Sequence, residues 1–297
     1  MKQQRPIKYI SVFIVAFLLL TTFLQGANAV EPVQNTPTLF NKAIFKQGTF
    51  GFANLDGSKL LVDYPQEQEL KWSQLNIAVG HKGQRLKIKL KGKQKEVEGS
   101  NGRQTAYNFD NLPGLVYEVV EGKAEPNETY FIVKGSALTE RMLVELKSIN
   151  KEKVTTNMKS EIGKLKKRAV KNVWPLENVR GFGKLYLVEF KPKGNNMLAS
   201  IALKTTNGWV FKDYPAKFKD NSAWRIDDGG EITPDMFTFT FAARTSQGFV
   251  IGVQWMGAEG ESTSFLEFTK MIKGKKGKKA KLTELNNVRY GRYMMPS

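Results

Sequence analysis

The residues best suited to chemistry form the string WRIDDGGE at positions 224–231. Two adjacent carboxylates beside glycines suit general acid–base work or a hard cation, because oxygen ligands converge where the chain turns tightly. The same residues are typical of a loop between two strands, in which glycine supplies positive φ angles. The alternating acidic spacing of a calcium loop is absent after Asp228. A turn is the favoured interpretation, and Asp227 and Asp228 remain candidate catalytic residues.

A second acidic loop, GAEGES at positions 257–262, contributes Glu259 and Glu261. If the two acidic loops meet at one end of a sheet, their carboxylates form a pocket in which a pair could act as in glycoside hydrolysis. A secreted, glycan-directed hydrolase is therefore the alternative function for this chain. A deep pocket lined by tryptophan near residues 224–231 would instead favour binding of a small ligand or glycan.

The composition excludes several kinds of site. The chain has no cysteine, which excludes disulfides, thiolate nucleophiles and thiolate metal or iron–sulfur centres. Its one histidine, His81, excludes a metal site built from clustered histidines. His81 lies in VGHKG, a composition typical of a surface turn, and no G-x-S-x-G motif accompanies it. We predict no metal and no cofactor.

Positive charge is the stronger signal, with 46 Lys and Arg against 28 Asp and Glu and a formal net charge of +18. The candidate residues for binding an anionic surface are Lys87, Lys89, Lys91, Lys164, Lys166, Lys167, Arg168, Lys273, Lys275, Lys276, Lys278 and Lys279. Clustered cations attract anionic polymers and lipid headgroups, and salt screens that attraction. A charge that only keeps the protein soluble is the alternative. No aromatic residue lies among the lysines of 85–95, so nucleic acid is not an expected partner.

The N-terminal residues 1–29 have the order of parts of a secretory signal. Three cations occur in the first eight residues, an apolar run covers 10–24, and Ala-Asn-Ala at 27–29 matches a cleavage site after Ala29. The apolar run is short for a membrane span, although an uncleaved anchor is the alternative. Cleavage would remove three positive charges and leave a mature chain of net charge +15.

Beyond a polar leader at 30–38, the pattern predicts an N-terminal β-rich domain at 39–135. Strands are expected at 58–64, 85–91, 115–120 and 129–133. In 85–91, apolar residues alternate strictly with lysine, which predicts a half-buried strand with a cationic outer side.

The period then changes, and residues 136–173 are expected to form a helical connector. Leu138, Met142, Leu146 and Ile149 fall at helical spacing, and a second stripe runs from Val154 to Ala169.

A C-terminal antiparallel β domain is predicted at 174–269, with a basic tail at 270–297. Strands are expected at 184–190, 197–204, 209–211, 237–242, 249–255 and 263–268. Phe237, Phe239 and Phe241 are expected to share one buried face at period two. Seven lysines in the twelve residues 270–281 repel one another and disfavour a compact state.

These observations predict an α+β, β-dominated fold in which two antiparallel β-rich halves are joined by a helical connector. The expected function is non-catalytic: an envelope-associated or extracellular binding protein, held on anionic cell-envelope polymers or lipid headgroups by its lysine clusters. The oligomeric state is left open by the sequence.

Overall fold

The computed structural model of this chain describes residues 39–63, 70–270 and 279–294. The expected signal peptide and leader lie outside the described residues, as do Lys273, Lys275, Lys276 and Lys278. Within the described ranges, no helix is both long enough and apolar enough to cross a membrane.

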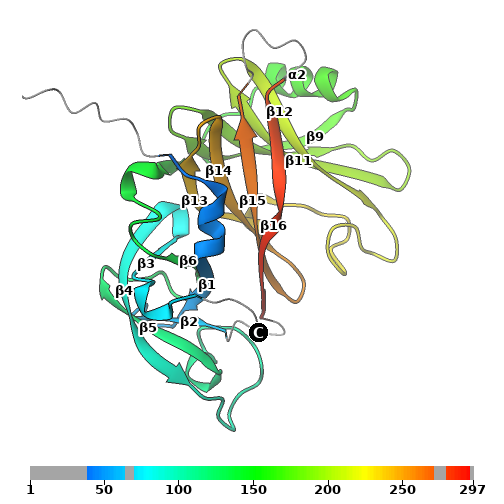
Figure 1. Cartoon of the computed structure of the whole chain (residues 1–297). Coiled ribbons are helices and arrows are strands. Elements are labelled where there is room, and N and C mark those ends of the chain that lie inside the picture. Colours follow the sequence, from blue (N-terminus) through cyan, green and yellow to red (C-terminus); the bar gives the residue numbers. More distant parts are fainter. Residues whose placement is uncertain (1–38, 64–69, 271–278, 295–297) are drawn as a thin grey trace, which may run out of the picture. The chain divides into compact units, whose positions relative to one another are not determined.

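Six antiparallel strands of the N-terminal half close into a barrel (Figure 1). They are β1 (Gly48–Ala53), β2 (Lys59–Val62), β3 (Ile77–Gly80), β4 (Gln84–Gln94), β5 (Gly114–Glu121) and β6 (Thr129–Val133). Their order around the barrel is β1-β2-β5-β4-β3-β6, and closure leaves no unpaired edge. The four strands expected in this half are confirmed as β2, β4, β5 and β6, whereas β1 and β3 were not expected. In β4 the apolar residues are inside while the lysines are exposed.

Side chains fill the barrel, so its interior is a core. Tyr117 and Tyr130 are fully buried there beside leucine and isoleucine side chains of β2 and β4. Their hydroxyl groups remain satisfied: the Tyr117 hydroxyl donates to the carbonyl of Trp72 at 3.0 Å, and the Tyr130 hydroxyl donates to Gln84.

The remaining strands form two five-stranded antiparallel sheets. The first has the order β12-β11-β10-β9-β8, built from β8 (Leu146–Ser148), β9 (Val170–Val179), β10 (Gly183–Phe190), β11 (Asn196–Thr205) and β12 (Gly208–Lys217). The second has the order β16-β15-β14-β13-β7, built from β7 (Leu143–Val144), β13 (Phe237–Arg244), β14 (Gly248–Met256), β15 (Gly260–Thr269) and β16 (Lys281–Tyr293). The short 3-10 helices are η1 (Lys42–Gln47), η2 (Trp72–Gln74), η3 (His81–Gly83), η4 (Phe109–Asn111), η5 (Glu140–Met142) and η6 (Pro234–Met236).

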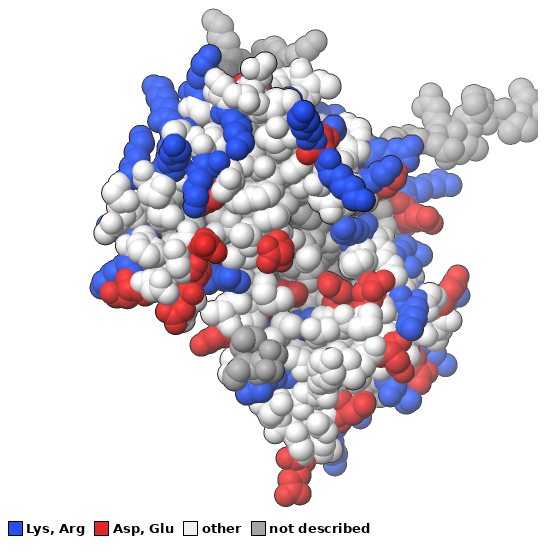
Figure 2. Space-filling view, turned by 180° about the vertical axis from the view of Figure 1, so that it is seen from behind, with Lys and Arg blue, Asp and Glu red and all other residues white. Residues whose placement is uncertain are grey.

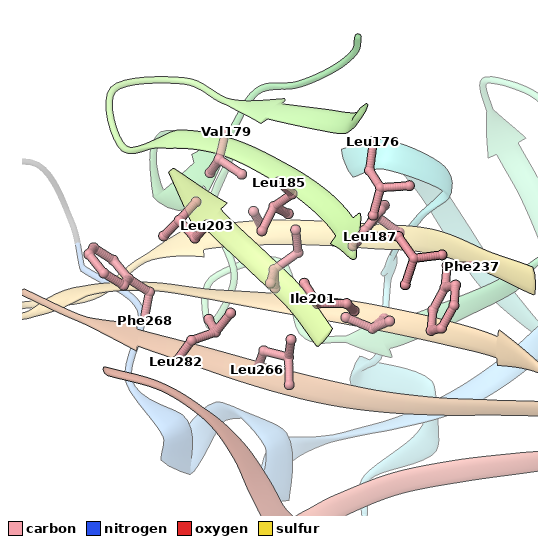
Figure 3. Packing of buried hydrophobic residues seen from close by; sticks show 14 of the residues in the cluster. Leu176, Val179, Leu185, Leu187, Ile201, Leu203, Phe237, Leu266, Phe268 and Leu282 are labelled. Atoms are coloured by element: carbon pink, nitrogen blue, oxygen red, sulfur yellow. The ribbon is translucent and has the colours of Figure 1, made fainter. Parts of the chain in front are cut away.

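The two sheets pack face to face over the largest apolar cluster (Figure 3). Leucine, isoleucine and valine side chains of β9, β10 and β11 point toward Phe237, Leu266, Phe268 and Leu282 of the second sheet. This burial is the main source of stability in a chain that has no disulfide.

The opposite face of the second sheet is also buried, because the barrel covers it. Phe241 and Phe265 on this face contact Phe45 and Phe131, with ring centroids 4.5 to 6.1 Å apart. The barrel and the sandwich accordingly belong to one compact unit, Thr38–Ser297.

A β-bulge in β13 corrects the expected row of phenylalanines. The pairing of β13 with β14 shifts between Phe239 and Ala242, so Thr240 and Phe241 together oppose Gly252. Phe237 and Phe239 face the first sheet, whereas Phe241 faces the barrel. Period two fails at one residue because the extra residue reverses the faces.

The expected fold is confirmed in being β-dominated and antiparallel, but the segment at 136–173 differs from a helical connector. Residues 138–149 form η5, β7 and β8, of which β7 joins the second sheet and β8 joins the first. Leu138 and Met142 enter the barrel-side core, while Leu146 enters the core between the sheets. The apparent helical spacing therefore arises from apolar residues that serve two different cores.

The second apolar stripe does form a helix, α2 (Thr156–Lys166). The hydroxyl of Thr155 accepts a hydrogen bond from the backbone N–H of Met158 at 3.2 Å, which caps the first turn. Met158 and Ile162 pack against the outer face of the first sheet. The helix ends at Lys167, whose φ of 50° is left-handed.

The basic tail expected at 270–297 is also corrected in its extent. Residues 281–293 form β16, which pairs along β15 and buries Leu282 and Arg292. The strand was not predicted from the sequence, because the segment is rich in lysine and has few apolar residues that anchor it.

Candidate functional site

Asp228 organises the loop that follows β12. Its Oδ1 accepts hydrogen bonds from the backbone N–H groups of Ala223 and Gly230, and its Oδ2 accepts from those of Trp224 and Arg225, all at 2.7 to 2.8 Å. Burial by itself would raise the pKa of Asp228, but these four donors outweigh it and hold the pKa below its ordinary value. The side chain is 9% exposed. Asp228 therefore holds the loop in shape.

Asp227 has a φ of 54° and points its exposed side chain to solvent in the same turn. The favoured interpretation of 224–231 as a turn agrees with this geometry, because Gly229 and Gly230 also adopt positive φ.

The second acidic segment is the β14–β15 hairpin, and it does meet the loop after β12. Arg225 Nη1 donates to the carbonyl of Met256 at 3.2 Å, which ties the two segments together. Glu259, at the hairpin turn, is exposed, whereas Glu261 is buried and accepts a hydrogen bond from the Thr129 hydroxyl at 2.7 Å. Of the four candidate acids, only Glu259 and Glu261 lie on a common cavity.

That cavity has a volume of about 620 Å³ and is walled by aromatic side chains. Tyr214, Trp224, Trp255 and Tyr293 line it, so tryptophan does line a cavity beside residues 224–231, although this cavity is open to solvent rather than deep. Trp255 packs edge-on against Tyr214 at 5.1 Å and tilted against Phe237 at 4.9 Å. The Trp224 indole N–H donates to the carbonyl of Tyr214 at 3.0 Å.

The charged residues on the cavity balance one another, three arginines against three glutamates: Arg225, Arg289, Arg292, Glu259, Glu261 and Glu284. Glu284 is paired through both oxygens, with Lys212 and with Arg289, each at 2.8 Å. Burial would raise the pKa of Glu284, but these two cations lower it overall.

Behind the cavity, Arg292 ties β16 to the barrel. Its Nη1 donates to the carbonyl of Asn127 at 2.5 Å and to the Thr129 hydroxyl at 3.1 Å, and its Nε donates to the carbonyl of Gln104 at 3.2 Å. The guanidinium lies 4.7 Å over the ring of Phe52. Arg292 is 3% exposed, so this charge belongs to the interior.

Two acids share the same interior region. Glu261 lies directly opposite Arg292 in the pairing of β15 with β16. Glu128, next to Thr129, is largely withdrawn from water; burial first, and then the charge of Glu261, raise the pKa of Glu128 to about 7.

The expected basic surface is partly neutralised on the barrel. Along β4, Lys91 pairs with Glu118 at 2.9 Å and Lys87 pairs with Glu121 at 3.6 Å. Lys89 alternates with them on the same exposed side. This strand consequently presents less net charge than its lysines suggest.

The run at 164–171 divides into paired and free cations. Lys166 pairs with Asp213 at 2.6 Å, Lys171 pairs with Glu189 at 2.8 Å, and Arg168 donates from Nε to the carbonyl of Lys191 at 2.9 Å. Lys164 and Lys167 are exposed and form no ion pair with a described carboxylate.

Three lysines outside the candidate set lie near the carboxyl end of α2, which carries Lys164 and Lys167: Lys191, Lys193 and Lys217. The guanidinium of Arg168 donates to the carbonyls of Lys191 and Asn196, which brings the β10–β11 loop to the end of α2. Lys193 Nζ donates to the carbonyl of Lys167 at 3.5 Å. Asn196 of that loop lies opposite Lys217 in the pairing of β11 with β12. We call the exposed set Lys164, Lys167, Lys191, Lys193 and Lys217 the basic end.

No residue of the basic end pairs with a carboxylate in the described part of the chain. Figure 2 shows basic side chains crowded over the part of the sandwich that carries α2, with few acidic side chains among them. The carboxyl end of α2 favours nearby cations through the helix dipole. The KPKGNN loop at 191–196 was the sequence signal for Lys191 and Lys193, but its proximity to α2 needed the fold.

Among the described residues, no group of three potential metal ligands converges. His81 lies in η3, the turn between β3 and β4, as expected from its flanking glycines. Comparison with protein-family models, with curated proteins and with solved structures finds no match for this chain.

Proposed function

We propose that this protein is an exported, non-catalytic binding protein that attaches to anionic groups of the cell envelope through its lysines. The observation that carries the proposal is the basic end, where five exposed lysines from three separate segments meet without acidic partners among the described residues. Scattered charge would suffice for solubility, whereas clustered charge raises the local potential that attracts a polyanion.

The proposal puts this surface outside the cell, because residues 1–29 have the order of parts of a secretory signal. The anionic groups available there are phosphates or carboxylates of envelope polymers and of lipid headgroups. Each lysine near an anionic membrane adds about 1 kcal/mol of attraction, so five together give useful affinity without any shaped pocket.

Hydrolysis is less well supported by the contacts of the candidate acids. A general acid and a general base must both be free to exchange protons with a substrate. Asp228 has both oxygens engaged, Glu261 is held by Thr129, and Asp227 points to solvent outside the cavity, so of the four acids Glu259 alone is free on the cavity. Binding therefore remains the function that the geometry favours.

The test compares two triple variants with the same change in net charge. One carries Lys167→Glu, Lys193→Glu and Lys217→Glu in the basic end. The control carries Lys71→Glu, Lys134→Glu and Lys147→Glu, which are exposed lysines away from it. Each protein is added to cell-wall preparations and, separately, to vesicles containing phosphatidylglycerol, over a range of salt concentrations.

We expect wild type and control to be retained at low salt and released as salt rises, with the basic-end variant released much earlier. If each substituted lysine contacts one anion, the slope of log affinity against log salt becomes shallower by about three. Preference for walls or for vesicles identifies the source of the anion. Retention that ignores salt, or equal loss in both variants, would contradict the proposal.

A further inference from the structure

The cavity at the β14–β15 hairpin is separate from the basic end and has different chemistry. We propose that it binds a short, uncharged oligosaccharide. This inference does not depend on the proposed attachment to anionic groups, because none of the five basic-end lysines lines the cavity.

The volume of the cavity and the aromatic side chains that line it suit a sugar. A volume of about 620 Å³ is in the range of small-ligand sites. Trp224, Trp255 and Tyr214 offer ring faces and edges along one side, and the exposed Tyr293 stands on β16. Aromatic rings of this kind pack against the C–H faces of a sugar ring, while the indole and phenol edges tolerate a wet surrounding.

The charges on the cavity lining favour an uncharged ligand. Three arginines and three glutamates cancel over the lining, so the cavity has no net attraction for an ion of either sign. A guanidinium group is planar and can form paired hydrogen bonds with adjacent hydroxyl groups, and Arg225 and Arg289 keep donors beyond the contacts to Met256 and Glu284. Glu259 is exposed at the rim and makes no ion pair with a described residue, so it is available as an acceptor.

The loop and the hairpin that line the cavity are held in place by contacts within the protein. Asp228 holds the loop that presents Trp224 and Arg225 through four backbone hydrogen bonds. Arg225 anchors that loop to Met256, and Trp255 packs on Phe237 of the core. Binding to a prepared site loses little conformational entropy of the protein, which makes binding of an uncharged ligand such as a sugar feasible.

Gly291 gives a way to block the cavity without damaging the fold. It lies on β16 among the lining residues, and the nearest atom to an added Cβ would be the Glu261 carbonyl at an ordinary 3.8 Å. Its φ is not left-handed, so Gly291→Val places a strand-favouring side chain at the cavity without backbone strain.

The experiment titrates the protein with chitotriose, cellotriose and maltotriose, and follows tryptophan emission and binding heat. We expect at least one trimer to bind in the millimolar range or tighter, with an affinity that salt does not change. Gly291→Val should abolish binding while the thermal unfolding midpoint stays near that of wild type. Glu259→Ala should weaken binding about tenfold through loss of a charged acceptor. Glu231→Ala, an exposed acid on the neighbouring loop but outside the cavity, should leave it unchanged.

Absence of binding by all three trimers would overturn the proposal, as would unaltered binding by a folded Gly291→Val protein. Binding of these uncharged trimers that falls with rising salt would mean that charged groups of the cavity, and not its aromatic walls, hold the sugar, which also contradicts it. The basic-end triple variant should bind the trimers as wild type does, so the two proposals fail or succeed separately.

Discussion

Replacing Glu128 with glutamine should stabilise the protein, and the gain should grow as the pH rises. Glu128 lies beside Thr129 at the junction of the barrel and the second sheet, near the charge of Glu261. Burial and that neighbouring carboxylate raise the pKa of Glu128 from 4.5 to about 7. The folded state therefore binds a proton that the unfolded state has already released between these two pH values.

The sign and size of this effect on the unfolding free energy follow from the linkage between proton binding and folding. A carboxyl whose pKa is raised on folding is fully favourable below the unfolded pKa, and this contribution is lost as pH rises through the folded pKa. A tenfold change in proton affinity is worth ~1.4 kcal/mol, so the ionised Glu128 destabilises the fold by about 3 kcal/mol above neutral pH. Glutamine has a similar shape and no charge, so Glu128→Gln removes this dependence.

The assay is urea unfolding of both proteins, followed by circular dichroism, at several pH values. The difference in unfolding free energy should be below about 1 kcal/mol at about pH 5 and should increase by about 2–3 kcal/mol by about pH 8.5. Glu96→Gln, at an exposed acid that does not act on Glu128, is the control and should leave the pH dependence of the wild type in place. A difference that is constant with pH, or that shrinks as pH rises, would refute the account of Glu128.

Two further predictions concern backbone geometry. Asp228→Asn should lower the unfolding free energy by about 2 kcal/mol in urea titrations, because the charged acceptor of four backbone N–H groups is lost. Asp227→Asn is the control and should stay within about 0.5 kcal/mol of wild type. Equal effects of the two substitutions would contradict the organising role of Asp228. Gly252→Ala should destabilise the folded protein by about 1–3 kcal/mol, because the new Cβ would lie 2.0 Å from Thr240 Oγ1 at the β13 bulge. An unchanged midpoint of urea unfolding would show that the bulge relaxes freely.

The features that depend on local pattern were predictable from the sequence. Alternation of apolar residues and lysine defined β4, and the stripe from Val154 defined α2, because each pattern is buried against a single core. The loop character of 224–231 was likewise predictable from its acids and glycines.

The candidate site was only partly predictable. The sequence identified Glu259 and Glu261 as a possible pocket and named tryptophan as the feature to seek, and both lie on one cavity with Trp224 and Trp255. It could not show that Asp228 is committed to backbone hydrogen bonds, since that depends on how the loop closes.

Composition and local periodicity thus determined a cationic, cysteine-free chain built mainly from antiparallel strands. Tertiary structure alone decided that Phe241 faces the barrel, that residues 143–148 join both sheets, and that 281–293 form an edge strand. It also decided which lysines are free, because Lys191, Lys193 and Lys217 reach α2 only through strand pairing and the contacts of Arg168. The physical reason is that burial and ion pairing depend on neighbours distant in sequence, whereas alternation and turn preference depend on adjacent residues.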